Sequence, residues 1–270
     1  MSEQPSGPPT GPPTGPTRLP PRGPMFMRDE YQNLIDEFTK DVKAELKNEV
    51  ESLILVGSVV TKEHIAGESD CDFLIVLKDK AGGDNLEKTM ENISKVVAHY
   101  LEDPLYSSLL DVEVLTSGEV PKDGETTDYP WTRVLVAQMG KSLIGKNPFE
   151  KIKIKDEDIK TSAKEMAAMF LKQMVEIPKL TEEEADDYEK LYLTVDAVLG
   201  CGCAYLYYNE EKEFYRSSAI ILFEDKYKGK INIEPIQISH RLRLASKSVN
   251  TDKFAQKALK FCKEVVKQLT

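Results

Sequence analysis

The sequence predicts an α/β domain with a short mixed sheet, followed by an all-α helical-bundle domain. Two short, continuous apolar runs at 53–56 and 73–77 are bounded by turn residues and are typical of buried strands. Strand-like and helix-like segments then alternate to about residue 150, as in α/β domains. From residue 156 onward, apolar residues recur at the three- and four-residue steps of amphipathic helices, which indicates a bundle.

The N-terminal segment differs in composition from the rest of the chain. Residues 1–24 contain nine of the fifteen prolines, in and around the near-repeat GPPTGPPTGPT. Because proline lacks a backbone N–H and these residues offer little to bury, we expect a disordered or polyproline-II-like tail. The expected organisation is a tail at 1–24, an α/β domain at 25–150 and a helical domain at 151–270.

Apolar periodicity and turn residues define the elements of the α/β domain in order. Residues 25–50 predict a helix, because Tyr31, Ile35 and Phe38 begin an apolar series at helical steps. The other expected elements are strands at 53–56 and 73–77, a loop at 78–85, a helix at 86–101, a strand at 109–115, a loop at 121–129 and a strand at 141–144. Residues 132–139 fit either a helix or a strand.

Four helices are expected in the second domain. The first covers 156–177 and ends at Pro178. The second begins at Thr181, where the sequence TEEE resembles a capping box, and continues towards Tyr208. The last two are expected at 214–227 and 246–269.

Two aspartates stand at the entrance of the second apolar run, where the chain reads Ser69-Asp70-Cys71-Asp72. Residues i and i+2 of a strand share a face, about 6.6 Å apart along the backbone, so both carboxylates point to the same side. Neighbouring carboxylates repel each other and lose hydration when buried, and a divalent cation offsets both costs. The pattern therefore predicts a metal site at Asp70 and Asp72, with Cys71 facing the core on the opposite side.

This stretch, with Gly57-Ser58 after the first apolar run and Asp70-x-Asp72 before the second, resembles the signature of the nucleotidyltransferase superfamily that includes DNA polymerase β. Within it, the minimal nucleotidyltransferases and kanamycin nucleotidyltransferase-like proteins are the closer likeness. The resemblance implies that Gly57 and Ser58 open a helix whose N–H groups hold nucleotide phosphates, since helix N-termini favour anions. It also implies that Asp70 and Asp72 are catalytic and bind Mg²⁺, which bridges the triphosphate.

The resemblance further implies a third carboxylate on a later strand. The run at 109–115 reads LLDVEVL, and Asp111 and Glu113 share one face of the strand expected there. A Val-Glu-Val pattern, as in kanamycin nucleotidyltransferase, favours Glu113, whereas the Val-Asp-Leu pattern of other members favours Asp111. We select Glu113 as the third catalytic and metal-binding residue and retain Asp111 as the alternative.

One position departs from the family pattern. Members often carry an arginine or another basic residue a few positions after Gly-Ser, near the triphosphate. Here Val59, Val60 and Thr61 occupy those positions, and Lys62 follows. We include Lys62 with Gly57 and Ser58 as a nucleotide-binding candidate, with a solvated lysine on a helix face as the alternative interpretation.

Composition limits the classes of partner. The net charge is −10, from 36 basic and 46 acidic side chains, which disfavours binding to nucleic acid because phosphates repel an acidic surface. The four cysteines do not make a disulfide framework in a chain of this length, and Cys201-Gly202-Cys203 lacks the spacing of a zinc site, so we interpret these two cysteines as packing residues. No continuous apolar stretch reaches about 18 residues, so we expect no membrane span and a cytoplasmic location.

Together these patterns predict a Mg-dependent nucleotidyltransferase. The implied cofactors are two Mg²⁺ ions held by Asp70, Asp72 and Glu113, and the implied donor is a nucleoside triphosphate, by preference ATP. The acceptor is a hydroxyl group of a small molecule or of a protein, and the sequence leaves its identity open. The alternative is a catalytically inactive nucleotide-binding or protein-interaction module of the same fold. A homodimer or a complex with a partner protein is compatible with either function.

Overall fold

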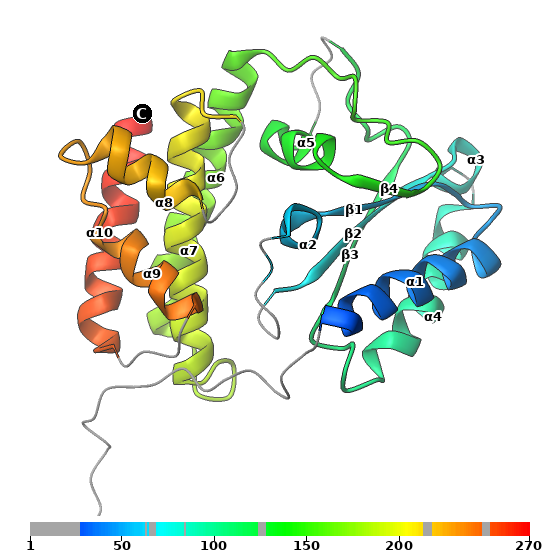
Figure 1. Cartoon of the computed structure of the whole chain (residues 1–270), viewed down its shortest axis with the longest axis horizontal. Helices are drawn as coiled ribbons and strands as arrows, with labels where there is room; N and C mark the ends of the chain where they lie inside the picture. Colours follow the sequence, from blue (N-terminus) through cyan, green and yellow to red (C-terminus); the bar gives the residue numbers. More distant parts are fainter. Residues whose placement is uncertain are drawn as a thin grey trace, which may run out of the picture.

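The computed structural model describes residues 28–62, 64, 69–83, 85–123, 128–212, 218–244 and 249–270. The tail expected at 1–24 lies outside these residues. Figure 1 shows a sheet with flanking helices on one side and a bundle of helices on the other. The predicted fold class, a mixed-sheet α/β domain followed by a helical bundle, is therefore confirmed.

The described residues form a mixed sheet of four strands in the order β3-β2-β1-β4. The strands are β1 (Val50–Val56), β2 (Cys71–Leu77), β3 (Leu110–Thr116) and β4 (Lys141–Ile144). β1 runs antiparallel to β2 and β4, whereas β2 and β3 are parallel. The C-terminal end of β1 and the N-terminal ends of β2 and β3 therefore lie at the same end of the sheet.

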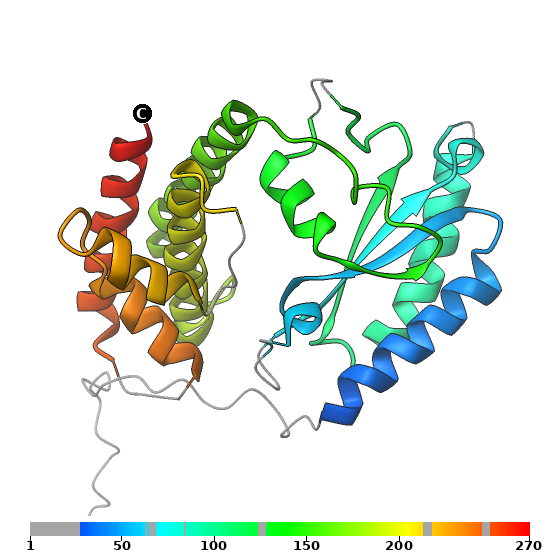
Figure 2. The same ribbon diagram turned by 45° about the horizontal axis from the view of Figure 1, so that its top comes forward.

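β1 and β2 are buried on both faces, in agreement with their continuous apolar sequences. Helices α1 (Arg28–Glu45) and α4 (Leu86–Leu101) cover one face, where the rings of Phe38 and Phe73 lie 4.6 Å apart. Helix α5 (Trp131–Gln138) covers the other face, and its Val134 shares a hydrophobic cluster with Ile54 and Leu74. Figure 2 shows α5 between the sheet and the bundle.

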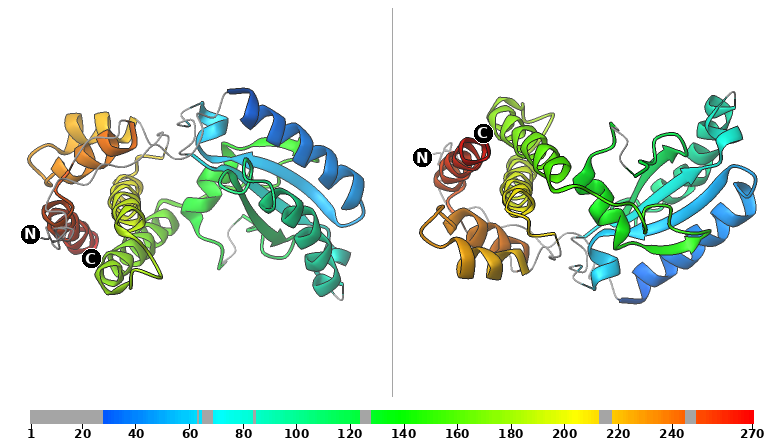
Figure 3. Two further views of the ribbon diagram at one scale, coloured as in Figure 1. Left: turned by 90° about the horizontal axis from the view of Figure 1, so that it is seen from below. Right: turned by 90° about the horizontal axis from the view of Figure 1, so that it is seen from above.

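The bundle is built around α7. Its helices are α6 (Asp156–Glu176), α7 (Asp187–Tyr208), α8 (Ser218–Leu222), α9 (Glu234–Leu244) and α10 (Thr251–Leu269), with a 3₁₀ turn at Ile177–Lys179 and a π-helical turn at Phe223–Tyr227. α6, α9 and α10 all pack against α7, and the views of Figure 3 show α7 enclosed among them. Helix α5 packs against α6 and so joins the bundle to the sheet.

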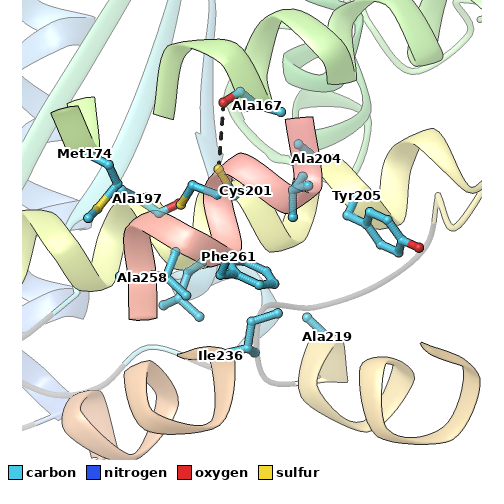
Figure 4. Close-up of a cluster of buried hydrophobic side chains, with 14 of the residues drawn as sticks. Ala167, Met174, Ala197, Cys201, Ala204, Tyr205, Ala219, Ile236, Ala258 and Phe261 are labelled. Carbon is cyan, nitrogen blue, oxygen red and sulfur yellow. Dashed lines mark hydrogen bonds between the residues drawn. The ribbon is translucent and has the colours of Figure 1, made fainter. Parts of the chain in front are cut away.

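By length and composition alone, α7 could cross a membrane, with a mean hydropathy of 1.2 over its apolar window. However, 72% of that window is buried inside the protein, so here α7 is the core helix of the bundle. Cys201 is fully buried in it, and its Sγ makes a weak hydrogen bond to the carbonyl oxygen of Ala167 at 3.7 Å (Figure 4). The packing role predicted for Cys201 is confirmed, and Cys203 is half-buried in the same helix.

Several boundaries of the α/β domain differ from the prediction. α1 ends at Glu45, and Val50 already belongs to β1, whereas the helix was expected to reach residue 50. The apolar residues Val42, Leu46 and Val50 continue the four-residue step beyond the helix end, so periodicity did not mark the stop. The expected loop at 78–85 contains the short helix α3 (Asp79–Gly82). The ambiguous segment at 132–139 forms α5, while the helix at 86–101 is confirmed as α4.

The start of α7 was predicted too early. Thr181 and Glu184 do make the reciprocal bonds of a capping box, with 2.8 Å from the Thr181 N–H to Glu184 Oε2 and 3.3 Å from the Glu184 N–H to Thr181 Oγ1. These bonds close only a turn. A second capping box, made by Asp186 and Glu189, begins the helix at Asp187.

The C-terminal part contains one helix that was not predicted. α9 was missed because its apolar residues are few and Pro235 stands near its start, which reads as a turn. The helix expected at 214–227 is observed as α8 and the following π-helical turn, and residues 213–217 lie outside the described residues. α10 begins at Thr251 instead of residue 246, because the Asn250 side chain caps it by accepting a hydrogen bond from the Lys253 N–H at 2.9 Å.

The contact between α6 and α7 depends on Gly200. A Cβ atom at this position would lie 2.1 Å from Cε2 of Phe170, inside the van der Waals distance of a buried ring. Because helices approach closely only where side chains are small, Gly200 allows the Phe170 ring to fill the space above α7.

We therefore predict that Gly200→Ala destabilises the bundle. Overpacking of a dense core costs about 1–3 kcal/mol, more than the roughly 1 kcal/mol that alanine gains over glycine within a helix. Urea unfolding should show a lower midpoint for Gly200→Ala. Gly118→Ala is the matched control, since its nearest heavy atom would be Thr116 Oγ1 at 3.9 Å. A wild-type midpoint for Gly200→Ala would contradict the proposed contact.

Candidate active site

Asp72 lies at the start of β2, beside the end of β1. Its backbone partner across the antiparallel pair is Val56, the last residue of β1. Cys71 is fully buried against α1 and α4, so its neighbour Asp72 points to the opposite face of the sheet, the face covered by α5. The orientation that the sequence predicted for Cys71 is therefore confirmed, and Asp72 is half-buried on the other side.

Gly57 lies directly against the Asp72 carboxylate. It opens the short helix α2 (Gly57–Thr61) with a φ of +75°, in the left-handed region that favours glycine. A Cβ atom on Gly57 would lie 2.1 Å from Asp72 Oδ2, so any other residue would displace this carboxylate and strain the backbone at this φ. Gly57 and Ser58 thus follow the end of β1 and begin α2, as the sequence motif predicts, and Gly57 lies beside Asp72.

Asp70 precedes β2 by one residue and is half-buried. The carboxylate of Asp70, like that of Asp72, acts electrostatically on the Cys71 thiol. Burial, then the carboxylates of Asp72 and Asp70 in that order, raise the pKa of the Cys71 thiol well above its ordinary value. The backbone before Asp70 is fixed by Tyr31, whose hydroxyl donates a hydrogen bond to the Ser69 carbonyl oxygen at 2.9 Å.

The acidic residues of β3 lie on the same face as Asp72. In the parallel pair of β2 and β3, Asp72 stands opposite Asp111 and Leu74 stands opposite Glu113. Partners in a parallel ladder point to the same side, so Asp111 and Glu113 share the face of Asp72 and α5. Asp111 is exposed, whereas Glu113 is half-buried.

Glu113 has two partners that the sequence did not reveal. The Tyr129 hydroxyl donates a hydrogen bond to Glu113 Oε2 at 3.5 Å, and Arg133 Nη1 lies 3.6 Å from the same oxygen. Burial and the Glu113 charge raise the pKa of Tyr129 above its ordinary value, while Arg133 acts in the opposite sense. Neither residue has a local sequence signal, because Tyr129 lies in a predicted loop and Arg133 lies in the segment that fitted either a helix or a strand.

Lys62 ends α2 and is exposed, with a left-handed φ of 61°. Its side chain makes no hydrogen bond or ion pair to any residue that the structure describes. Lys62 follows Ser58 by about one helical turn. Its role as a phosphate ligand stays a prediction.

The donor set suits a hard divalent cation. Mg²⁺ prefers carboxylate oxygens, and the face beside Gly57 presents the carboxylates of Asp72, Asp111 and Glu113. Because Gly57 packs closely on Asp72, this carboxylate lies beside the turn to which the motif assigns phosphate binding. Among the described residues, however, no three His, Cys, Asp or Glu side chains lie close enough together to enclose a metal ion. The ligands share a face, but they do not form a closed set in this conformation.

A separate depression lies behind the sheet. It is formed between α1 and α4, with Asp41, Lys95 and His99 among its lining residues. These helices cover the face of Cys71, so the depression is separated from Asp72 by the sheet itself. It is no part of the candidate site.

Comparisons with known proteins identify the domain that carries this site. The family model of the nucleotidyltransferase domain matches residues 35–107, about a quarter of the chain. The matched range contains Gly57, Ser58, Asp70 and Asp72, and it ends before β3 and Glu113. A search of curated proteins found no significant match.

Seven chains of solved structures match significantly. One of them is the spectinomycin adenyltransferase AAD(9) from Enterococcus faecialis, in a crystal structure with ATP and spectinomycin. The identity is 15% and the TM-score is 0.57, and the match covers 86% of this chain and 99% of that chain. At this identity the match shows a shared fold, and its coverage extends that fold from the sheet into the bundle.

The predicted resemblance is thus confirmed by a matching domain model and by a shared fold. The motif residues Gly57 and Asp72 lie in contact within the matched range. The chain therefore contains a nucleotidyltransferase domain at residues 35–107, and the two matches together support a nucleotidyltransferase enzyme.

Proposed function

We propose that the chain is a magnesium-dependent nucleotidyltransferase that uses ATP as its preferred donor and a hydroxyl group of a small molecule as its acceptor. The single observation that carries the proposal is the contact of Gly57 with the Asp72 carboxylate on the face that also holds Asp111 and Glu113. A phosphate-binding turn and a set of carboxylates are both needed to bind a metal-complexed triphosphate, and here they meet at one end of the sheet.

In the proposed site, Asp70, Asp72 and Glu113 hold Mg²⁺. When bound, the metal supplies charge neutralisation for the triphosphate and stabilises the attacking and leaving oxygens. Gly57, which lies against Asp72, and Ser58 begin α2, and in the proposed site their backbone N–H groups orient the phosphates. The acceptor hydroxyl gives its proton to solvent water and its oxygen forms a bond to the α-phosphorus, while the bond between the α-phosphorus and the bridging oxygen breaks and pyrophosphate leaves.

The position of the bundle supports a small-molecule acceptor. α5 covers the face that carries the carboxylates and packs against α6, so the bundle lies on the reactive side of the sheet (Figure 2). A similar two-part fold occurs in the adenyltransferase whose structure contains ATP and spectinomycin. The net charge of −10 disfavours an RNA acceptor, since the polyanion and the acidic chain repel each other. A protein hydroxyl is the second acceptor class that the assay includes.

The function is tested by label transfer from [α-³²P]ATP in the presence of Mg²⁺. Spectinomycin is the first acceptor, followed by a panel of other polyhydroxylated amines and by a cell lysate for protein acceptors. We expect transfer that stops with EDTA.

In the same assay Asp72→Asn should lose about a thousandfold in rate, the scale of several kcal/mol of transition-state stabilisation. Asp36→Asn, an exposed aspartate on α1, is the matched control and should keep the wild-type rate. Nucleotide binding without transfer to any acceptor would favour the inactive module instead.

The third carboxylate is predicted to be Glu113. It is half-buried and contacts Tyr129 and Arg133, which limits its motion, whereas Asp111 is exposed. Glu113→Gln should therefore lower the rate of transfer by about a hundredfold to a thousandfold. Asp111→Asn should change it by a few-fold at most. A larger loss in Asp111→Asn would assign the third position to Asp111, which faces Asp72 directly across the strands.

The packing of Gly57 predicts a second functional effect. Gly57→Ala forces the Asp72 carboxylate away from its place, and a displacement of about 1 Å at a reacting site costs about a hundredfold in rate. The matched control is Gly145→Ala, which has a similar φ of +67° and a Cβ position 2.1 Å from the Glu51 carbonyl oxygen. Both variants should unfold at lower urea concentration, but only Gly57→Ala should lose transfer per folded molecule. Equal activity in the two variants would argue against Gly57 as a part of the site.

A further inference from the structure

We propose that Arg133 and Tyr129 are positioning residues for Glu113, which hold its Oε2 atom and leave Oε1 to act in the site. This inference rests on the proposed function, because it gives Glu113 a partner set within that reaction. The two residues come from the segment before α5 and from its first turn, and no part of the nucleotidyltransferase model match includes them.

Both contacts of Glu113 end on one oxygen. The Tyr129 hydroxyl is 3.5 Å from Oε2, and Arg133 Nη1 is 3.6 Å from the same atom. Within the described part of the chain, Oε1 makes no hydrogen bond or ion pair. The carboxylate is therefore held from one side, and its second oxygen stays available on the face shared with Asp72.

Packing fixes the Tyr129 side chain and the backbone that carries Arg133. Tyr129 is buried, and its ring lies 5.8 Å from that of Phe149 in the cluster beneath α5. Arg133 follows Trp131 and precedes Val134, which are both buried in that cluster and hold α5 on the sheet. Three rotatable bonds join the Glu113 carboxylate to its backbone, and neighbouring donors restrict their motion. Loss of such outer-shell partners typically costs 10-fold to 100-fold in activity.

α5 is also held from the side of the bundle. Thr132, which lies next to Arg133, donates its N–H to Ser162 Oγ of α6 at 3.3 Å, and the two hydroxyl oxygens lie 3.2 Å apart. These contacts are buried. The place of Arg133 beside Glu113 is therefore set by the sheet and by α6 together.

Two simpler interpretations of Arg133 make different predictions. With 60% of its side chain exposed, Arg133 could form an ordinary surface ion pair, which contributes little and leaves catalysis unchanged. Alternatively, it could bind the triphosphate directly, in which case its effect does not depend on Glu113. A double-mutant cycle separates these interpretations from a role that acts through Glu113.

The experiment measures label transfer from [α-³²P]ATP with Mg²⁺ and the acceptor used by the wild-type chain, with spectinomycin as the first probe. Arg133→Ala should lower kcat about 10-fold or more, with the KM for ATP within about threefold of wild type. Arg133→Lys should recover most of this loss, because a single donor contacts Oε2. Tyr129→Phe keeps the ring in the core and should lower kcat several-fold. Lys95→Ala, on α4 behind the sheet, removes an equal charge and should have no effect.

The deciding comparison is made in the Glu113→Gln background. There, Arg133→Ala should change the residual rate by less than twofold, because the partner of Arg133 is already altered. Independent losses that multiply in the double variant, or a wild-type kcat in Arg133→Ala, would overturn the positioning role while the proposed function stands. A wild-type chain that labels no acceptor would overturn the proposed function and this inference with it.

Discussion

The candidate site depends on the contact between the Gly57 backbone and the Asp72 carboxylate. The antiparallel pairing of β1 and β2 brings the end of one strand beside the start of the other, with Val56 opposite Asp72. A Cβ at this position would force that carboxylate to move and would strain the left-handed backbone, so glycine suits the close approach. The parallel pairing of β3 then adds Asp111 and Glu113 to the same face. The register of three strands thus brings the Gly57 turn and the carboxylates of Asp72, Asp111 and Glu113 to one face of the sheet.

The parts of this arrangement that are local in sequence could be predicted from it. The apolar runs gave β1 and β2, and the two-residue alternation placed Cys71 and Asp72 on opposite faces. The choice between Asp111 and Glu113 could not be made in the same way, because both share a face and the difference lies in their surroundings. Tyr129 and Arg133, which create that difference, reach Glu113 only through the tertiary packing of α5. A repeated local pattern also led to a wrong helix start. Thr181 and Glu184 form the bonds of a capping box, but α7 begins at the capping box five residues later.

α5 has a larger role in the structure than its length suggests. Its sequence, WTRVLVAQ, gave no clear preference, since β-branched residues alternate with residues that suit a helix. In the folded chain one side of it packs on the sheet, Thr132 contacts Ser162 of α6, and Arg133 reaches Glu113. The bundle is consequently joined to the sheet next to the acidic residues and not at a remote edge. Changes in the packing of α6 can therefore reach the third carboxylate through one short helix.

The charge balance of this face explains how the chain folds with several acidic residues side by side. Repulsion between Asp72 and Asp111 is weakened by solvent, because Asp111 is exposed and Asp72 is only half-buried. Glu113, which is more enclosed by α5, has the Arg133 guanidinium 3.6 Å away. An ion pair this exposed is weak, so a divalent cation with its much larger charge can compete for the same carboxylate at little cost in stability. The fold thus tolerates the acidic face because solvent screens Asp111 and the Arg133 guanidinium lies beside Glu113.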